Sequence, residues 1–231
     1  ADMNFKLGNF KEAIALGKEQ YGKSNAEEKS QLSKIIGESY FNLGEYAAAI
    51  PYLKEYRGTR GKWNNTDYYQ LGYAYYKQGD YSNAIAEFNK IISGKDDVAQ
   101  NAYYHLAESY LQQGKKQQAL NAFKNASEMD FSAEIREDAL YNYAKLGYEI
   151  GNPYQSVSQV FLTYLEDYPN SQRKSEMENL LVDSYISSKN FKDAMELLEK
   201  NKGIASAEVY QKVAFYRGLE LYDEGDFQDA N

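Results

Sequence analysis

The chain has 231 residues, of which 43% are hydrophobic and 26% are charged, and it contains only three prolines. This balance is typical of an ordered chain with a substantial core rather than of a disordered one. The formal net charge of −8 argues against a nucleic-acid backbone or an anionic membrane as the main partner, and the lack of cysteine excludes disulfides and thiolate metal sites.

The first residues are predicted to form the end of one helix, a turn and a second helix, all within 1–22. Phe5 and Leu7 precede Gly8 in this stretch, and Phe10 and Ala13 follow it. A complete helix pair is expected next, over residues 27–57.

The clearest helix pair lies over residues 64–93. Leu71 and Tyr75 are four residues apart, and so are Ala84 and Phe88, so each of these two spacings marks one face of a helix. The small residue Gly72 would let the two helices approach closely. Neither helix can bury its apolar face alone, so the pair needs neighbours on both sides.

Four further pairs are expected over 97–127, 134–169, 173–201 and 207–231, the last one truncated but continuing through Phe227 and Ala230. Pro153 is expected in the first turn of a second helix, where proline is tolerated. Because both ends look cut within a pair, we expect a single array that is a piece of a longer one, with possible self-association through its ends.

A turn separates the two helices of each pair, and the turns recur every 35 to 38 residues. Glycine adopts the left-handed conformation of such a turn at the lowest cost. The turn positions are Gly8, Gly44, Gly79, Gly114, Gly151, Lys189 and Gly225. In five pairs the next residue is predicted to cap the second helix, at Asn9, Asp80, Asn152, Asn190 and Asp226.

The pattern at Tyr68, Leu71-Gly72, Tyr75, Gly79-Asp80-Tyr81, Ala84 and Phe88 resembles the tetratricopeptide repeat. The resemblance extends over almost the whole chain. It implies an all-α fold, a right-handed superhelical α-solenoid of helix–turn–helix units. It also implies a non-catalytic scaffold that binds a peptide or a partner's helix in a concave groove.

In that family the first helices of the pairs line the groove. Carried over position by position, with the adjacent His105 added, the predicted groove residues are Lys34, Glu38, Tyr69, Tyr73, Tyr76, Lys77, Asn101, Tyr104, His105, Glu108, Gln112, Tyr141, Lys145 and Tyr148. Tyr69, Tyr104 and Tyr141 occupy equivalent positions and are expected to form a ladder that binds the partner. The alternative is that these tyrosines pack against their neighbours within the solenoid.

Other kinds of site find little support. One subclass of the family grips a C-terminal carboxylate with Lys and Asn, but Glu38 stands where Asn is needed and would repel a carboxylate. His105 is the only histidine, which leaves too few ligands for a metal and no obvious catalytic base. We therefore expect no enzyme activity and no cofactor. No apolar run reaches the ~20 residues of a membrane-spanning helix, so no direct transmembrane insertion is expected.

The loop from Arg57 to Trp63 is basic, rich in glycine and holds the only tryptophan. It lacks the ending of a phosphate-binding loop. We interpret it as a long linker in which Trp63 covers the edge of the next helix pair. The alternative is a knob for an interaction with a partner.

The stretch from Phe161 to Ser171 resembles the ending of repeats in bacterial cell-envelope proteins, among them outer-membrane assembly lipoproteins. This resemblance implies a periplasmic or outer-membrane-associated location in a bacterium, with the cytoplasm as the alternative. It also leaves open two other functions, which are binding of cell-wall carbohydrate and a structural spacer role in a longer array.

Overall fold

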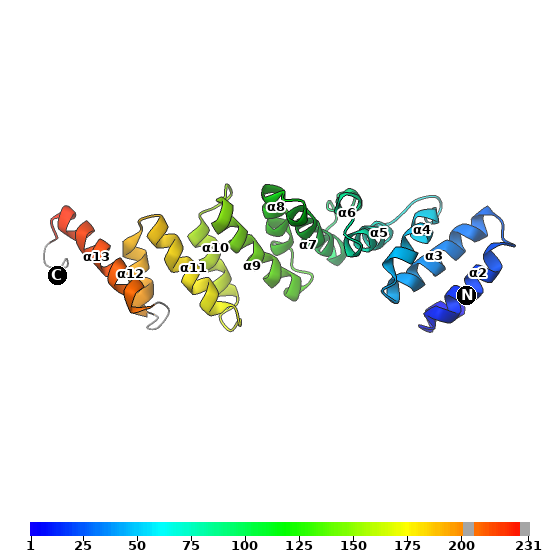
Figure 1. Cartoon of the computed structure of the whole chain (residues 1–231), viewed down its shortest axis with the longest axis horizontal. Helices are drawn as coiled ribbons and strands as arrows, with labels where there is room; N and C mark the ends of the chain where they lie inside the picture. The colour runs from blue at the N-terminus through cyan, green and yellow to red at the C-terminus, as the bar shows by residue number, and fades with distance from the viewer. Residues whose placement is uncertain (201–205, 227–231) are drawn as a thin grey trace. The chain divides into compact units, whose positions relative to one another are not determined.

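The structure, a computed structural model that describes residues 1–200 and 206–226, is all-helical, as the sequence predicts (Figure 1). These two ranges contain thirteen helices and no strand. A single isolated bridge joins Thr59 to Lys62 within them. The predicted positions Phe227 and Ala230 lie outside the described residues.

Residues 1–139 form the first of two compact units. Its helices are α1 (Asp2–Lys6), α2 (Phe10–Tyr21), α3 (Ala26–Asn42), α4 (Tyr46–Glu55), α5 (Asn65–Lys77), α6 (Tyr81–Phe88), α7 (Asp97–Gln112), α8 (Lys116–Ser127) and the start of α9 (Ala133–Ile150). From α1 to α8, each helix packs on the next one along the chain. The long first helices also contact each other, α3 with α5 and α5 with α7, so one side of this unit is built from first helices.

Residues 140–231 form the second compact unit. It contains the rest of α9, together with α10 (Val157–Asp167), α11 (Lys174–Ser187), α12 (Phe191–Lys200) and α13 (Ala207–Glu224). Helix α11 packs on both α10 and α12, and α12 packs on α13. The helix–turn–helix organisation is thus present in both units, while the superhelical winding of a single array stays a prediction.

All seven predicted turn positions adopt the left-handed backbone conformation. The six glycines have φ between 70° and 84°, and Lys189 has φ 57°. A Cβ atom built on any of these six glycines would meet no other atom within 4 Å. Backbone conformation, rather than crowding, therefore favours glycine at the turns.

At Gly72, by contrast, crowding rather than backbone conformation favours glycine. A Cβ atom there would lie 2.8 Å from the Phe88 ring, and one on Gly37 would lie 3.0 Å from the Leu53 backbone nitrogen. The missing side chain lets α5 approach α6 closely, as predicted. Phe88 fills the resulting contact and is fully buried, which stabilises the fold by roughly 2–3 kcal/mol.

The predicted helix caps are only partly right. The Asp80 and Asn190 side chains accept hydrogen bonds from backbone N–H groups three residues on, in Asn83 and Asp193. Asn9, however, makes no capping hydrogen bond. Stronger caps lie at the starts of first helices, where Asn25 and Asn64 form reciprocal capping boxes.

The expected position of Pro153 in a helix is wrong. Helix α10 begins only at Val157, because Ser156 caps it by accepting the backbone N–H of Gln159. Asn152 instead accepts the backbone N–H of Tyr154 at 3.0 Å and forms a turn around Pro153. The loop after Gly151 is therefore longer than in the other pairs.

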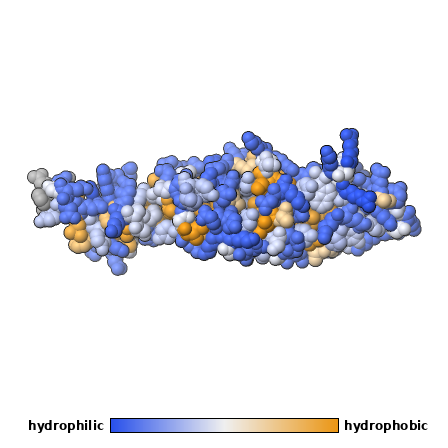
Figure 2. All heavy atoms as spheres, turned by 90° about the horizontal axis from the view of Figure 1, so that it is seen from above, coloured by the Kyte–Doolittle hydropathy of each residue, from blue (hydrophilic) through white to orange (hydrophobic). Residues whose placement is uncertain are grey.

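In the second helix of a pair, the core is formed by a buried alanine and a buried large apolar residue four positions later. Ala49, Ala84, Ala119 and Ala194 are fully buried, and the large side chain four residues after each of them is also buried. In the face shown in Figure 2 the surface is mostly hydrophilic, with separate apolar patches. No helix among the described residues combines the length and apolar character that crossing a membrane requires.

Candidate binding surface

Three tyrosines on α5 and one histidine on α7 form a group that we call the aromatic cluster: Tyr69, Tyr73, Tyr76 and His105. The tyrosines share one face of α5 because they are spaced four and three residues apart. Their ring centroids lie 6.2, 4.9 and 5.1 Å, respectively, from the centre of the His105 ring. All four side chains are half-buried, so each also reaches solvent.

The aromatic cluster extends to neighbouring helices of the same unit. The Tyr73 ring lies 5.7 Å from both Phe41 on α3 and Tyr46 on α4. The Tyr76 ring lies 6.0 Å from Tyr81 on α6. Rings from three consecutive helix pairs therefore meet here and present a continuous, partly exposed aromatic surface.

Glu108 places a carboxylate beside the aromatic cluster. Its Oε2 atom lies 2.8 Å from Nδ1 of His105. Burial, reinforced by the negative charge of Glu108, raises the pKa of the Tyr76 phenol. Burial likewise raises the pKa of Tyr69 and of Tyr73. At neutral pH these hydroxyls are uncharged and can donate hydrogen bonds.

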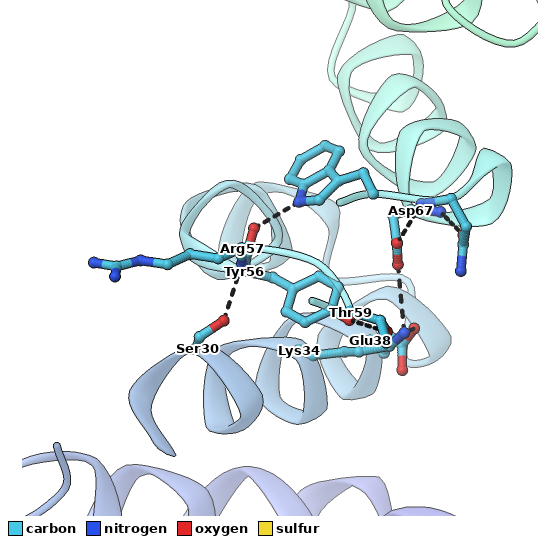
Figure 3. Close-up of polar contacts among 9 residues, drawn as sticks. Ser30, Lys34, Glu38, Tyr56, Arg57, Thr59 and Asp67 are labelled. Carbon is cyan, nitrogen blue, oxygen red and sulfur yellow. Dashed lines mark hydrogen bonds and ion pairs between the residues drawn. The ribbon is translucent and has the colours of Figure 1, made fainter. Parts of the chain in front are cut away.

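Lys34 and Glu38 on α3 form an ion-paired group with Asp67 on α5 (Figure 3). Lys34 Nζ lies 3.4 Å from Asp67 Oδ1 and 3.8 Å from Glu38 Oε1. Asp67 is only 5% exposed and also accepts the backbone N–H of Asn64. Burial raises the pKa of Glu38, although the positive charge of Lys34 opposes this shift. Two predicted groove residues thus link one helix pair to the next.

The tyrosines of the predicted ladder also contact the following first helix. The Tyr104 hydroxyl donates to Asp138 on α9, and the Tyr141 hydroxyl donates to Glu176 on α11 at 2.9 Å. Lys145 Nζ bonds to the same carboxylate at 2.8 Å, which lowers the pKa of Glu176. The polar tips of Tyr104 and Tyr141 are therefore already engaged within the chain, as the packing alternative describes.

The remaining predicted groove residues lie at the surface or near it. Lys77 is exposed, with its ammonium 5.9 Å from the centre of the Tyr73 ring. Asn101 donates to the Asp97 carbonyl of its own helix, and Gln112 is exposed at the end of α7. Tyr148 belongs to the second unit, where its ring lies 6.1 Å from Phe161. Lys77 is therefore placed to contact a partner beside the aromatic cluster.

A group of side chains that could hold a metal ion is a further kind of candidate site. Within 1–200 and 206–226, no group of three or more His, Asp or Glu side chains could hold a metal ion. His105 has one carboxylate neighbour and several ring neighbours. Its surroundings are those of a packing and hydrogen-bonding residue.

Sequence reasoning missed two buried polar residues that support this surface. Asp67 belongs to the capping pattern Asn64-x-x-Asp67, which could have been recognised. Gln100 on α7 is fully buried, and its amide bonds to backbone groups of residues 126–132. No pattern in the sequence marks Gln100, because its partners lie at the end of α8 and in the irregular linker that follows it.

Three family models match parts of the chain. Residues 104–172 and 35–56 match two tetratricopeptide repeat models, and residues 59–126 match the model of anaphase-promoting complex, cyclosome, subunit 3. A search of curated proteins finds no match.

Several solved structures share the fold. The C-terminal part of a TPR repeat-containing protein from Cytophaga hutchinsonii is 16% identical, with a TM-score of 0.60 over 99% of this chain and 89% of that one. The apo form of RapI is 15% identical, with a TM-score of 0.55 over 91% and 64% of the two chains. MamA from MSR-1 is 16% identical, with a TM-score of 0.51 over 76% and 96%. At these identities the likeness shows the fold alone.

Proposed function

The chain carries tetratricopeptide repeats, and we propose that it is a non-catalytic scaffold that binds a peptide or a helix of a protein partner on the aromatic cluster. The observation that carries this proposal is the convergence of three half-buried tyrosines and His105 on one face of α5 and α7. Repeats of this kind are typically interaction modules rather than enzymes.

Tyrosines in such a cluster suit recognition of another protein. Each offers a large apolar ring with few rotatable bonds, so little conformational entropy is lost on binding. Neighbouring rings already restrict Tyr73, which lies within 6.0 Å of five other aromatic rings: Phe41, Tyr46, Tyr69, Tyr76 and His105. A surface ordered before binding loses less free energy when the partner arrives.

Polar residues around the cluster would set the register of the bound segment. The Tyr73 hydroxyl interacts with Tyr46 and the Tyr76 hydroxyl with Glu108, and the exposed Lys77 has its ammonium 5.9 Å from the centre of the Tyr73 ring. The hydroxyls of Tyr104 and Tyr141 are bonded to carboxylates of the following first helix, Asp138 and Glu176. The binding test concerns Tyr73 and Tyr76, because their rings lie nearest to His105 in the aromatic cluster.

Peptides selected from a random phage-displayed library on the wild-type protein would serve as probes. We expect the double variant Y73A/Y76A to weaken their binding about tenfold to hundredfold, because the two rings supply most of the contact area. The matched control Y154A/Y210A removes two exposed tyrosines elsewhere and should leave affinity unchanged. Titration calorimetry measures both variants.

The variant Y73F/Y76F separates the ring from the hydroxyl. If the rings dominate, Y73F/Y76F should retain most of the affinity. Undiminished binding by a folded Y73A/Y76A, as judged by circular dichroism and thermal melting, would rule out the aromatic cluster as the site. Selected peptides that bind the variant and the wild type equally would then locate binding elsewhere.

We also propose that the protein works in the periplasm or outer-membrane region of a bacterium, with the cytoplasm as the alternative. Support comes from the resemblance of Phe161–Ser171 to cell-envelope repeats. These residues have packing roles of their own, since Phe161 and Tyr164 are fully buried and the Tyr164 hydroxyl lies 2.9 Å from Ser171 Oγ. Fractionation of source cells with an antibody against the chain tests the location; recovery only with cytosolic markers would contradict it.

A further inference from the structure

The loop between α4 and α5 concentrates positive charge on an acidic chain. Arg57, Arg60 and Lys62 fall within seven residues that contain no carboxylate, while the whole chain has a net charge of −8. All three residues are exposed, and none of them has an ion-pair partner in the part of the chain that the structure describes. Figure 3 shows the Arg57 side chain extending away from the Lys34 and Asp67 contacts.

Short hydrogen bonds hold this basic loop in one shape. The Arg57 backbone N–H donates to Ser30 Oγ at 2.9 Å, and the Trp63 indole N–H donates to the Tyr56 carbonyl at 2.6 Å. The loop folds back tightly at Gly58, where a Cβ atom would lie 2.2 Å from the Lys62 carbonyl carbon. The cations are therefore presented by an ordered backbone, which reduces the entropy cost of binding.

An open hollow of about 570 Å³ lies at this loop. It is lined by Arg57, Gly61, Lys62, Trp63 and Tyr68. The Trp63 and Tyr68 rings form its apolar wall, with centroids 5.0 Å apart. The ammonium of Lys90 lies 5.0 Å from the centre of the same Tyr68 ring, but it is already paired with Glu87 at 2.6 Å.

We propose that this basic hollow binds an acidic segment of a protein partner. Arg57 and Lys62 would pair with its carboxylates, and the Trp63 and Tyr68 rings would contact its aliphatic stems. Charge complementarity is the reason for this occupant, because basic groups without internal partners gain most from an anionic ligand. The site shares no residue with the aromatic cluster, so the two proposals stand or fall separately.

Trp63 gives a direct readout, because it is the only tryptophan in the chain and lines the hollow. The probe is a hexaglutamate peptide, titrated into the full chain at low salt while tryptophan fluorescence is recorded. We expect a saturable change that weakens as salt is added. A hexaglutamine peptide should produce no change.

The double variant R57Q/K62Q should weaken hexaglutamate binding roughly tenfold or more. The matched control K11Q/K212Q makes the same change in net charge at two exposed lysines elsewhere and should bind as the wild type does. No saturable change with the wild type, or an equal loss in both variants, would overturn the proposal. An oligothymidine of equal charge that binds as tightly as hexaglutamate would also overturn it, in favour of a general polyanion site.

Discussion

Lys189 adopts the left-handed backbone conformation that glycine adopts at the other turns, with φ 57°. A residue with a Cβ atom pays a steric penalty there that glycine avoids. We expect Lys189→Gly to raise the free energy of unfolding by roughly 0.5–1 kcal/mol, measured by urea denaturation. The reverse change, Gly151→Lys, should lower it by a similar amount, since Gly151 has φ 82° and open space around it. Equal stabilities in all three proteins would show that these turns carry no conformational preference.

Substitution of Gly72 tests whether the close approach of α5 to α6 requires a glycine, rather than whether the backbone conformation does. The Cβ atom of Gly72→Ala would lie 2.8 Å from the Phe88 ring, which is fully buried. We expect a loss of about 1–3 kcal/mol from overpacking, seen as a lower thermal midpoint. Gly22→Ala is the control, because Gly22 has a helical φ of −66° and no atom near its added Cβ. It should be neutral or slightly stabilising.

Residues with a repeated pattern were predictable, and those with unique partners were not. The small and large positions of each helix recur at fixed spacing, so Ala84 and Phe88 could be assigned to the core from the sequence. The partners of Tyr104 and Tyr141 lie 34 and 35 residues further on, about one repeat later. A search for acidic residues at that offset could have found both contacts. The capping boxes that begin at Asn25 and Asn64 also have a recognisable sequence pattern, with an acidic residue three positions further on.

At the scale of elements, Gln100 connects α7 to the end of α8 and to the linker between α8 and α9. Its Nε2 donates to the carbonyls of Ala126 and Met129, and its Oε1 accepts the N–H groups of Phe131 and Ser132. The side-chain amide of Gln100 thus supplies hydrogen-bond partners for four backbone groups between Ala126 and Ser132.

Removing this amide should loosen the linker. We expect Gln100→Ala to lower the free energy of unfolding by about 3 kcal/mol, because several buried backbone groups lose their partners together. Hydrogen exchange should accelerate most at the amides of Phe131 and Ser132. The control Gln118→Ala changes an exposed residue of α8 and should alter neither quantity. Unchanged exchange at both amides would contradict this role for Gln100.

The helix pairs were more predictable than the loops between them. Helix periodicity and the turn glycines located the pairs along the chain. The loop around Pro153 was mispredicted, because Ser156 competes successfully with Asn152 as the cap of α10. The placement of Trp63 was correct, since its ring packs on Tyr68 of the following helix.

At the scale of the whole molecule, several half-buried side chains have a raised pKa and so favour the protonated form. Burial raises the pKa of Tyr69, Tyr73, Tyr76 and Tyr104. Burial alone would lower the pKa of Lys34, but the carboxylates of Glu38 and Asp67 outweigh it and the pKa rises. Above the ordinary tyrosine pKa of 10.0, the unfolded chain therefore releases protons that the folded chain still holds.

These groups contribute their full stabilisation at pH values below the pKa that each has in the unfolded chain. This stabilisation is lost as the pH rises through the higher pKa that each has in the folded chain. We expect the unfolding free energy to fall steeply with pH above about 10, measured by urea denaturation at a series of alkaline pH values. The triple variant Y69F/Y73F/Y76F should have a shallower slope, because phenylalanine does not ionise. The control Y154F/Y210F/Y222F removes three exposed hydroxyls and should keep the wild-type slope. Identical slopes in all three proteins would exclude the aromatic cluster as the source.

The open space around the turn glycines has a practical consequence for engineering. No atom lies within 4 Å of the position that a side chain would occupy at Gly44, Gly79 or Gly114. A side chain introduced at such a corner would project into water without meeting the packed helices, at the conformational cost that any Cβ atom has at these positive φ angles. The corners therefore offer attachment points for fluorophores or other side-chain labels, spaced at nearly regular intervals along the polypeptide.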